Sequence, residues 1–247
     1  MKINPDKTPE GVDLKQVREI LTRDSKRLGF FHARSNTIDI PLIALPGVYL
    51  SREFGENFGD SGYFAEKVPD IVKDKSFLEI GCGTGLVSIA VALRTRSYPP
   101  QQNRIVTSDI NPNAVRNTRI NVLLNNVERM IGVREGYVFS PIDPEEKFDY
   151  IFWNHPFHSG KPFETMVMRA GFDPKFRGLE GYVRNAQNYL TKDGTVLLGT
   201  GNFADLDLIR EIVSKYGRLN LLCWTHKPFK GKAGEQNTFN IYKIEYN

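Results

Sequence analysis

The chain has 247 residues, of which 40% are hydrophobic and 25% are charged, so it can bury a full core and is not a wholly disordered chain. It holds only two cysteines, no apolar run long enough to span a bilayer and no signal-peptide core, which excludes a disulfide framework and predicts a cytoplasmic protein with no membrane partner. The net charge is +4, and the whole excess lies in residues 210–247, which hold seven basic and three acidic residues; such a segment either steers a polyanion or is a solvated face.

Residues 1–75 are predicted to form a small N-terminal helical and β element. Apolar residues recur there near helical spacing: Val12, Leu14, Val17, Ile20, Leu21 and Leu28. Residues 37–45 form a β-rich stretch that is broken by Pro41 and closed by the turn Pro46-Gly47. A second helix follows, with either Asp60 or Ser61 as its N-cap. We expect this element to recognise the substrate or to act as a lid.

From residue 76 onward, apolar strands alternate with helical patterns, which is typical of right-handed βαβ units and a parallel sheet. The expected strands are 76–81, 104–110, 131–139, 148–154 and 194–201, and the expected helices are 85–95, 112–126, 179–190 and 203–217. Gly217 is expected to cap the last helix. Two final strands, 219–225 and 239–246, are joined by a loop too short for a crossover helix, which favours an antiparallel edge pair. The prediction for residues 76–247 is a doubly wound, Rossmann-like α/β domain with a mostly parallel seven-stranded sheet and an antiparallel C-terminal strand.

The first motif is a glycine-rich turn between the first strand and the first helix of this domain, Glu79-Ile-Gly81-Cys82-Gly83-Thr-Gly85. Glycines at such a turn let a ligand approach the backbone and leave helix N–H groups available to it. The alternative is a tight turn that binds nothing. The spacing is GxGxG rather than the GxGxxG of dinucleotide-binding enzymes, which disfavours a nicotinamide dehydrogenase.

The second motif lies at the end of the next strand, where Asp109 and Ile110 precede Asn111 and Pro112. A carboxylate at the carboxyl end of a strand can accept hydrogen bonds from the hydroxyl groups of a ribose. Asp109 and Asn111 are also both suitable helix N-caps. The position at the ligand-binding edge of an open α/β sheet favours the ligand role for Asp109.

The third motif, Asn154-His155-Pro156-Phe157-His158-Ser-Gly, follows the strand that ends near residue 154. By itself it is equally consistent with an ordinary Asn/Pro turn after a buried strand. In combination with the two earlier motifs, it favours a reactive site at the same edge of the sheet.

The order LEIGCGTG, TSDINPNAV and FDYIFWNHPFHSG resembles the class I S-adenosylmethionine-dependent methyltransferases. Within that class, it resembles the enzymes that methylate planar nitrogens through an Asn-Pro-Pro-Tyr/Phe motif. The resemblance implies S-adenosylmethionine as cofactor. No metal is expected, because the four histidines show no metal-ligand spacing with the two cysteines. The resemblance implies these cofactor-binding positions: Glu79, Gly81, Cys82, Gly83, Gly85, Asp109, Ile110, Val138 and Asn154. It implies these catalytic positions: Asn154, His155, Pro156 and Phe157.

Two subfamilies share further features with the chain. NHPFHSG and PGVYLSREFGENFGDSGYF resemble segments of the ribosomal RNA guanine-N2 methyltransferases of the small-domain type. GYVFSPI and GLEGYVRNAQNYLTKDG resemble segments of the protein glutamine-N5 methyltransferases. In the latter, an acid usually stands where this chain has Tyr137, so Val138 or a backbone amide is expected to contact the adenine. RNA is our first expectation for the substrate, protein glutamine the second, and a small heteroaromatic or amide compound the third.

The motif suggests how a poor nucleophile is methylated. The Asn154 side-chain oxygen and the His155 backbone oxygen accept the two N–H groups of the substrate nitrogen and orient its lone pair, while Phe157 stacks on the planar substrate. His155 or His158 is available to take the proton afterwards, and His158 is a further substrate-contacting residue. His155 stands where the family has proline, which also leaves open a binding module that holds cofactor or RNA without catalysis.

Overall fold

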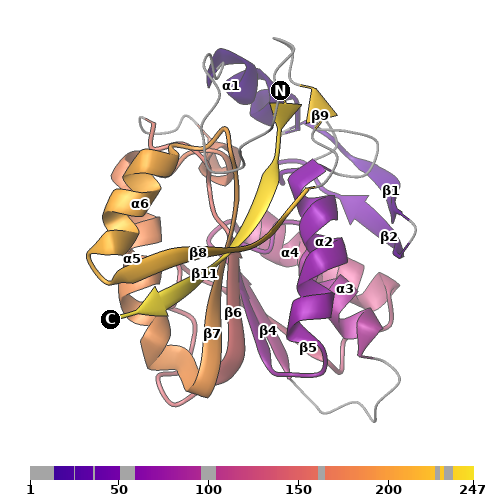
Figure 1. Ribbon diagram of the computed structural model, residues 1–247. Coiled ribbons are helices and arrows are strands. Elements are labelled where there is room, and N and C mark those ends of the chain that lie inside the picture. Colours follow the sequence, from indigo (N-terminus) through magenta and orange to yellow (C-terminus); the bar gives the residue numbers. More distant parts are fainter. Residues whose placement is uncertain are drawn as a thin grey trace.

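The computed structural model describes residues 14–24, 26–35, 37–50, 59–95, 104–160, 165–225, 229–230 and 236–247. Its centre is one seven-stranded sheet in the order β5-β4-β3-β6-β7-β11-β8 (Figure 1). The strands are β3 (Phe77–Ile80), β4 (Ile105–Asp109), β5 (Ile131–Glu135), β6 (Phe148–Asn154), β7 (Leu190–Gly201), β8 (Gly217–Trp224) and β11 (Phe239–Tyr246). β3 to β7 pair in parallel, and β11 runs antiparallel to both of its neighbours. The predicted Rossmann-like fold is confirmed.

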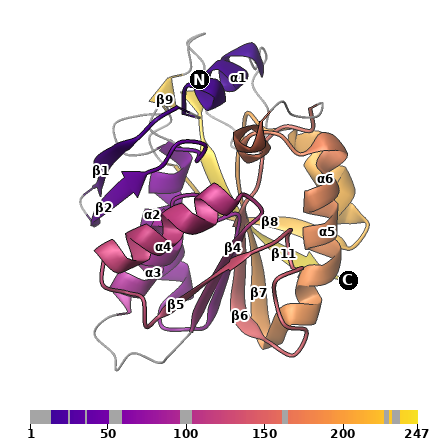
Figure 2. The same ribbon diagram turned by 180° about the vertical axis from the view of Figure 1, so that it is seen from behind.

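Helices cover both faces of this sheet, as Figures 1 and 2 show from opposite sides. α2 (Gly59–Val72), α3 (Leu86–Arg94) and α4 (Pro112–Leu124) lie on one face, and α5 (Arg177–Asn185) and α6 (Leu206–Ser214) lie on the other. Successive side chains of a strand point to opposite faces of a sheet, so β6 contributes to the hydrophobic core on each face. Phe152 packs in the core on the face covered by α2, α3 and α4. Ile151 and Trp153 pack in the core on the face covered by α5 and α6.

The N-terminal element consists of α1 (Leu14–Asp24) and a hairpin of β1 (Gly29–Arg34) and β2 (Asp39–Ala44). The helix ends at Asp24, earlier than predicted, and Leu28 lies beyond it with 69% of its surface exposed. Val12 lies outside the described residues. Sequence reasoning missed β1 entirely. Pro41 does not break β2, because the pair is a two-stranded sheet that forms no other ladder for proline to interrupt.

Asparagines on α4 attach this hairpin to the main domain. Asn117 accepts the Leu45 N–H at 2.8 Å and donates to the Ile43 carbonyl at 2.6 Å. Asn121 and Asn125 follow at intervals of four residues and also bond to β2. Because residues four apart share one face of a helix, the three side chains form a ladder along the hairpin edge. This ladder is why β2 sits next to the glycine-rich turn.

Several predicted boundaries differ from the structure; β7, for example, begins at Leu190 rather than at residue 194, and α5 ends at Asn185 rather than at residue 190. β5 ends at Glu135, and the residues after it form turns rather than strand. Gly217 begins β8 instead of capping α6, which ends at Ser214. Asp60 lies inside the first turn of α2, which begins at Gly59 in the described part of the chain.

Candidate functional site

Three neighbouring strands end at the same edge of the sheet, where β3, β4 and β6 run out at Ile80, Asp109 and Asn154. A cavity lies at this edge. It is lined by all of the residues that the sequence predicts to bind the cofactor except Gly85: Glu79, Gly81, Cys82, Gly83, Asp109, Ile110, Val138 and Asn154. The parallel pairing of β3 with β4 and β6 is what brings these separate motifs together, because parallel strands end at the same edge of a sheet.

The glycine-rich turn follows β3 directly and forms the floor of the cavity. Gly81 adopts φ +68°, and a Cβ there would come within 2.7 Å of the Trp153 indole nitrogen. Gly83 also has a positive φ, but a Cβ on it would meet nothing within 4 Å. The first glycine is therefore needed for packing against β6, and the second leaves open space in the cavity. Both conformations favour glycine over other residues.

Asp109 ties β4 to this turn. Its Oδ2 accepts the Gly83 N–H at 2.9 Å and its Oδ1 accepts the Asn111 N–H at 2.8 Å. Burial raises the pKa of the Asp109 carboxyl, while the backbone N–H groups act in the opposite direction. Each carboxylate oxygen retains a further acceptor lone pair for a ligand. The helix cap belongs to Asn111, whose Oδ1 accepts the Asn113 N–H at 3.1 Å, so Asp109 is not used for capping.

The side chains of Glu79 and Cys82 are buried and make hydrogen bonds inside the protein. The Glu79 Oε2 accepts the Ser88 backbone N–H at 3.0 Å and also the Ser88 hydroxyl. Burial raises the pKa of Glu79 to about 7. The Cys82 sulfur lies 3.3 Å from the Thr118 hydroxyl, and burial raises the pKa of its thiol, which keeps it protonated and unreactive. Both side chains hold the turn in place.

Asn154 is the last residue of β6 and lines this cavity, and its hydrogen-bond partner Asp60 lines a second, smaller pocket. Its Nδ2 donates to Asp60 Oδ2 at 2.8 Å. Its Oδ1 is buried and has no hydrogen-bond partner among the residues that the structure describes. A buried acceptor without a partner is costly, and such atoms are found where a ligand supplies the missing donor. This oxygen is therefore available to accept a hydrogen bond from a ligand.

The second pocket is mostly aromatic. It is lined by Val17, Leu21, Tyr49, Asp60, His155, Phe157, His158, Ala170, Gly171, Phe203 and Phe239. Tyr49 lines the cofactor-side cavity as well, so the two hollows adjoin. Phe157 packs edge-on against Phe203, with 5.1 Å between ring centroids. Its aromatic rings lie close to Asn154, since Asp60, which bonds to Asn154, is part of the same lining.

Neither histidine of the motif is a surface residue, since His155 is 1% and His158 is 2% exposed. Burial lowers the pKa of His155 to about 3, so its imidazole is neutral and weakly basic. This argues against His155 as a proton acceptor. His158 Nδ1 lies 3.9 Å from the Asp205 carboxylate, whose other oxygen accepts the Ser159 N–H at 2.7 Å. Asp205 thus helps to hold the loop that carries Phe157, because its carboxylate accepts the Ser159 N–H and its backbone N–H donates to the Phe157 carbonyl.

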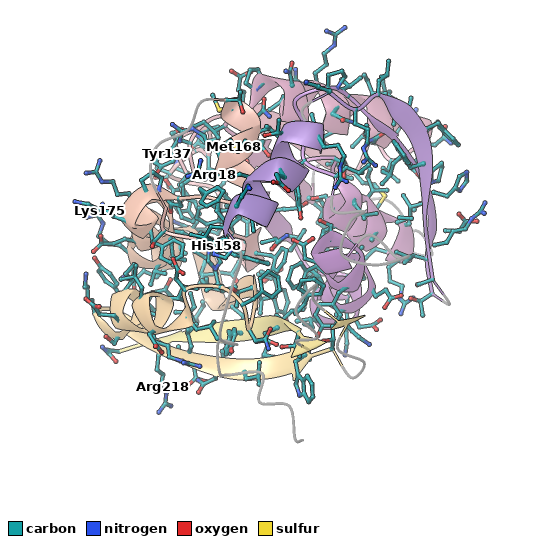
Figure 3. The ribbon with its side chains drawn as sticks, turned by 90° about the horizontal axis from the view of Figure 1, so that it is seen from above. Arg18, Tyr137, His158, Met168, Lys175 and Arg218 are labelled. Carbon is teal, nitrogen blue, oxygen red and sulfur yellow. The ribbon has the colours of Figure 1, made fainter. Side chains whose placement is uncertain are left out.

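The site is covered by α1 and by the short 3₁₀ helix η2 (Met166–Ala170), which pack against each other. Leu21 packs with Met168 and Phe172, and the Arg18 guanidinium lies 4.7 Å from the centre of the Phe172 ring. Figure 3 looks onto this end of the molecule, with Arg18 on α1 close to Met168. These contacts make α1 part of the roof over the motif.

The basic C-terminal segment leaves the sheet at the same edge. Phe239, the first residue of β11, pairs with Gly201 at the carboxyl end of β7, and Asn240 pairs with Trp224 at the end of β8. Between them, β9 (Phe229–Lys230) and β10 (Gln236–Asn237) form a short antiparallel pair. Figure 1 places β9 at the end of the molecule that carries α1. Lys227 and Lys232 lie outside the described residues.

Sequence reasoning missed three residues of the site. Trp153 packs against Gly81, Tyr49 joins the two hollows, and Asp60 holds the Asn154 amide. No local pattern distinguishes them, because each acts on a residue far away in the chain. In the described part of the chain, no helix is long and apolar enough to cross a membrane, and no cluster of three His, Cys, Asp or Glu side chains is arranged to hold a metal ion.

The residues of the larger cavity fit S-adenosylmethionine. The Asp109 carboxylate has acceptor capacity for ribose hydroxyls, Ile110 and Val138 offer apolar surfaces for an adenine, and the open space at Gly83 admits a ligand against the backbone. Val138, which lines this cavity, has an unusual backbone φ of +49°. Together, the order of the strands and the residues of this site are those of a class I methyltransferase.

Solved structures share that fold. A T. thermophilus 16S rRNA N2 methyltransferase, in complex with AdoMet and guanosine, has a TM-score of 0.60 at 19% identity, covering 89% of this chain and 51% of that one. An M. jannaschii tRNA methyltransferase has a TM-score of 0.56 at 18% identity, covering 89% and 55%. Residues 39–223 match the methyltransferase small domain model. The chain belongs to the methyltransferase small domain family, whose members are S-adenosylmethionine-dependent methyltransferases.

Several relatives of the chain belong to the two subfamilies that the motifs resemble. A Methanocaldococcus jannaschii protein, provisionally named a protein N5-glutamine methyltransferase, is 37% identical over 51% of this chain and 61% of its own length. The release factor glutamine methyltransferase of Fusobacterium nucleatum is 27% identical over 91% and 67%. The ribosomal RNA small subunit methyltransferase C of Psychromonas ingrahamii is 25% identical over 70% and 42%. The chain thus spans between two fifths and two thirds of these relatives.

Proposed function

We propose that this protein transfers the methyl group of S-adenosylmethionine to a planar, exocyclic nitrogen, and that the acceptor is the N2 amino group of a guanine in RNA. The observation that carries the reaction type is the buried Asn154 Oδ1, which has no partner in the described structure and lies where the cofactor cavity meets an aromatic pocket. S-adenosylmethionine supplies a methyl group that is already activated by its sulfonium.

The chain's own residues would act by positioning. Asp109 and the turn around Gly83 would hold the nucleoside part of the cofactor. Asn154 Oδ1 would accept one N–H of the substrate nitrogen. That bond orients the delocalised lone pair toward the methyl group and stabilises the positive charge that develops on nitrogen. His155 would contribute its backbone oxygen rather than its ring, because the buried imidazole has a lowered pKa.

The aromatic lining supports a planar base as substrate. Phe157, Phe203 and Phe239 surround the pocket beside Asn154, and aromatic side chains bind splayed-out bases by stacking. The basic segment between β8 and β11 emerges at this edge of the sheet, where positive charge would attract a polyanion. Similarity to a structure with bound guanosine agrees with this substrate class.

A protein glutamine amide is the second candidate. The 37% identity to the Methanocaldococcus jannaschii protein favours it. A glutamine side chain is also planar at its nitrogen and presents two N–H groups, so Asn154 would serve it in the same manner. The two candidates differ in what surrounds the nitrogen, which is a base in one case and a peptide in the other.

The test is methylation of cell extract by the purified protein with radiolabelled S-adenosylmethionine, followed by nuclease or protease digestion. We expect nuclease alone to release the label and nucleoside analysis to identify N2-methylguanosine. Asn154→Ala should reduce transfer by about 10²-fold or more and leave binding of S-adenosylhomocysteine in place. Asn185→Ala, which alters an amide on α5 outside both hollows, is the matched control. Protease-sensitive label would instead support glutamine, and full activity of Asn154→Ala would refute the assigned role.

A further inference from the structure

Asp60 stands apart from the residues that the family motifs supply. It lies in the first turn of α2, 94 residues before Asn154, and is only 4% exposed. Its Oδ2 accepts the Asn154 Nδ2 hydrogen at 2.8 Å. A buried carboxylate is costly unless its neighbours compensate for the lost water. Its presence next to the motif calls for a reason beyond packing.

The chemistry of the two groups supplies that reason. An asparagine amide can turn over, exchanging its acceptor oxygen and its donor nitrogen, with little change in shape. An ionised carboxylate only accepts hydrogen bonds, so only the NH₂ side of Asn154 can face Asp60. The oxygen must then face the other way, where it is buried and has no partner among the described residues.

We propose that Asp60 is a positioning residue that locks the Asn154 amide so that Oδ1, and not Nδ2, faces the methyl-accepting nitrogen. This inference rests on the proposed function and adds to it the residue that decides the direction of the Asn154 amide. With the amide reversed, an N–H would face the N–H of the substrate, and the lone pair would not be oriented. Asp60 does not touch the reacting atoms and acts only through Asn154.

Protonation weakens this lock, because a carboxylic acid can donate as well as accept. Burial raises the pKa of Asp60 to about 6, although the Asn154 hydrogen bond acts to lower it. The other titratable groups that line the same pocket are Tyr49, before α2, and His155 and His158, after β6. α1 faces the pocket with apolar Val17 and Leu21, and β11 with Phe239. A test must therefore separate Asp60 from the two histidines.

A first test needs no substrate. In ¹H–¹⁵N spectra, the side-chain NH₂ signals of Asn154, assigned by their loss in Asn154→Ala, should shift with a midpoint near pH 6. The shift should disappear in Asp60→Asn and persist in His158→Gln. Persistence of the same midpoint in Asp60→Asn would overturn the proposal. Because no methyl acceptor is involved, this result stands whether or not the proposed RNA substrate is correct.

The second test is kinetic and uses the RNA fraction that accepts label from the wild-type protein. Asp60→Asn places a group that can pair with either face of the Asn154 amide, so we expect kcat to fall by about tenfold to a hundredfold. The KM for RNA and the affinity for S-adenosylhomocysteine should change little. Asp60→Glu, which restores a carboxylate, should recover part of kcat. Asp70→Asn, which removes an exposed charge that pairs with Arg94 on the same side of the sheet, is the control. An unchanged kcat in a folded Asp60→Asn would overturn the proposal.

Discussion

The Asn121 side-chain oxygen accepts the backbone N–H of Ile43 at 2.7 Å, across 78 residues of sequence. Its Nδ2 donates to the carbonyl of Ile43 and to that of Thr84, each at 2.9 Å. One fully buried side chain thus joins α4, the N-terminal hairpin and the glycine-rich turn. The shape of the cofactor cavity depends on this three-way junction, since Thr84 is part of its lining.

Asn121→Leu keeps a similar volume and removes every one of these bonds. Three backbone groups then lose a buried partner, and we expect the free energy of unfolding to fall by about 3 kcal/mol, at roughly 1 kcal/mol for each bond. Urea unfolding measures this change. Arg116→Ala, at an exposed position on the same helix, should alter stability by no more than about 0.5 kcal/mol. Equal effects of the two substitutions would contradict the junction.

Asp109→Ala should weaken binding of S-adenosylhomocysteine at least tenfold, because it removes the carboxylate that faces the cavity at the end of β4. It also deprives the Gly83 and Asn111 N–H groups of their acceptor. Isothermal titration calorimetry measures the dissociation constant, and thermal unfolding checks that the variant is folded. Asp143→Ala, at an exposed position outside this cavity, is the control. An unchanged dissociation constant in a folded Asp109→Ala would refute the ribose assignment.

Glu79 should make the protein less stable at alkaline pH. Burial raises its pKa from 4.5 to about 7, so the stability that it contributes is fully present below pH 4.5 and is lost as the pH rises through 7. Glu79→Gln should therefore be more stable than the wild type at about pH 8, by at most about 3 kcal/mol. The difference should be small at about pH 5.

Urea unfolding at both pH values tests this, with Glu128→Gln at an exposed position as control. The uncharged amide can still accept the hydrogen bonds of the Ser88 backbone and hydroxyl. A Glu79→Gln protein that is destabilised equally at both pH values would show that the carboxylate is ionised at little cost.

The basic segment offers a test of the RNA proposal that does not depend on catalysis. Replacing Lys227, Lys230 and Lys232 together by glutamate should weaken binding of a single-stranded RNA oligonucleotide. It should also lower the slope of log affinity against log salt by about 0.7 for each lysine that contacts phosphate. Fluorescence anisotropy measures both. Lys192→Glu, near the opposite end of β7, should have little effect. An unchanged salt slope in the triple variant would remove the electrostatic support for RNA.

The motifs and the alternation of strands and helices could be predicted from sequence because they are local. Glycine spacing, the position of Asp109 at a strand end and the turn after Asn154 each occupy a few consecutive residues. Apolar periodicity likewise identified the sheet and the antiparallel pair at the C-terminus. Less regular segments were harder. β1 was missed because its polar residues, His32 and Arg34, leave only a short apolar pattern, and it is held by pairing with β2 and a bond to Asp39.

The sequence alone determined the fold class, the family resemblance and the residues offered for cofactor and chemistry, and it located the whole excess of positive charge in residues 210–247. Only the tertiary structure decided that one part of this segment, the loop between β8 and β11, leaves the sheet at the edge where Asn154 lies. It also decided that Asp60, which lies in the first turn of α2, bonds to Asn154. The reason is physical: local patterns report periodicity and turn chemistry, whereas a contact between residues 94 positions apart exists only once the chain is packed.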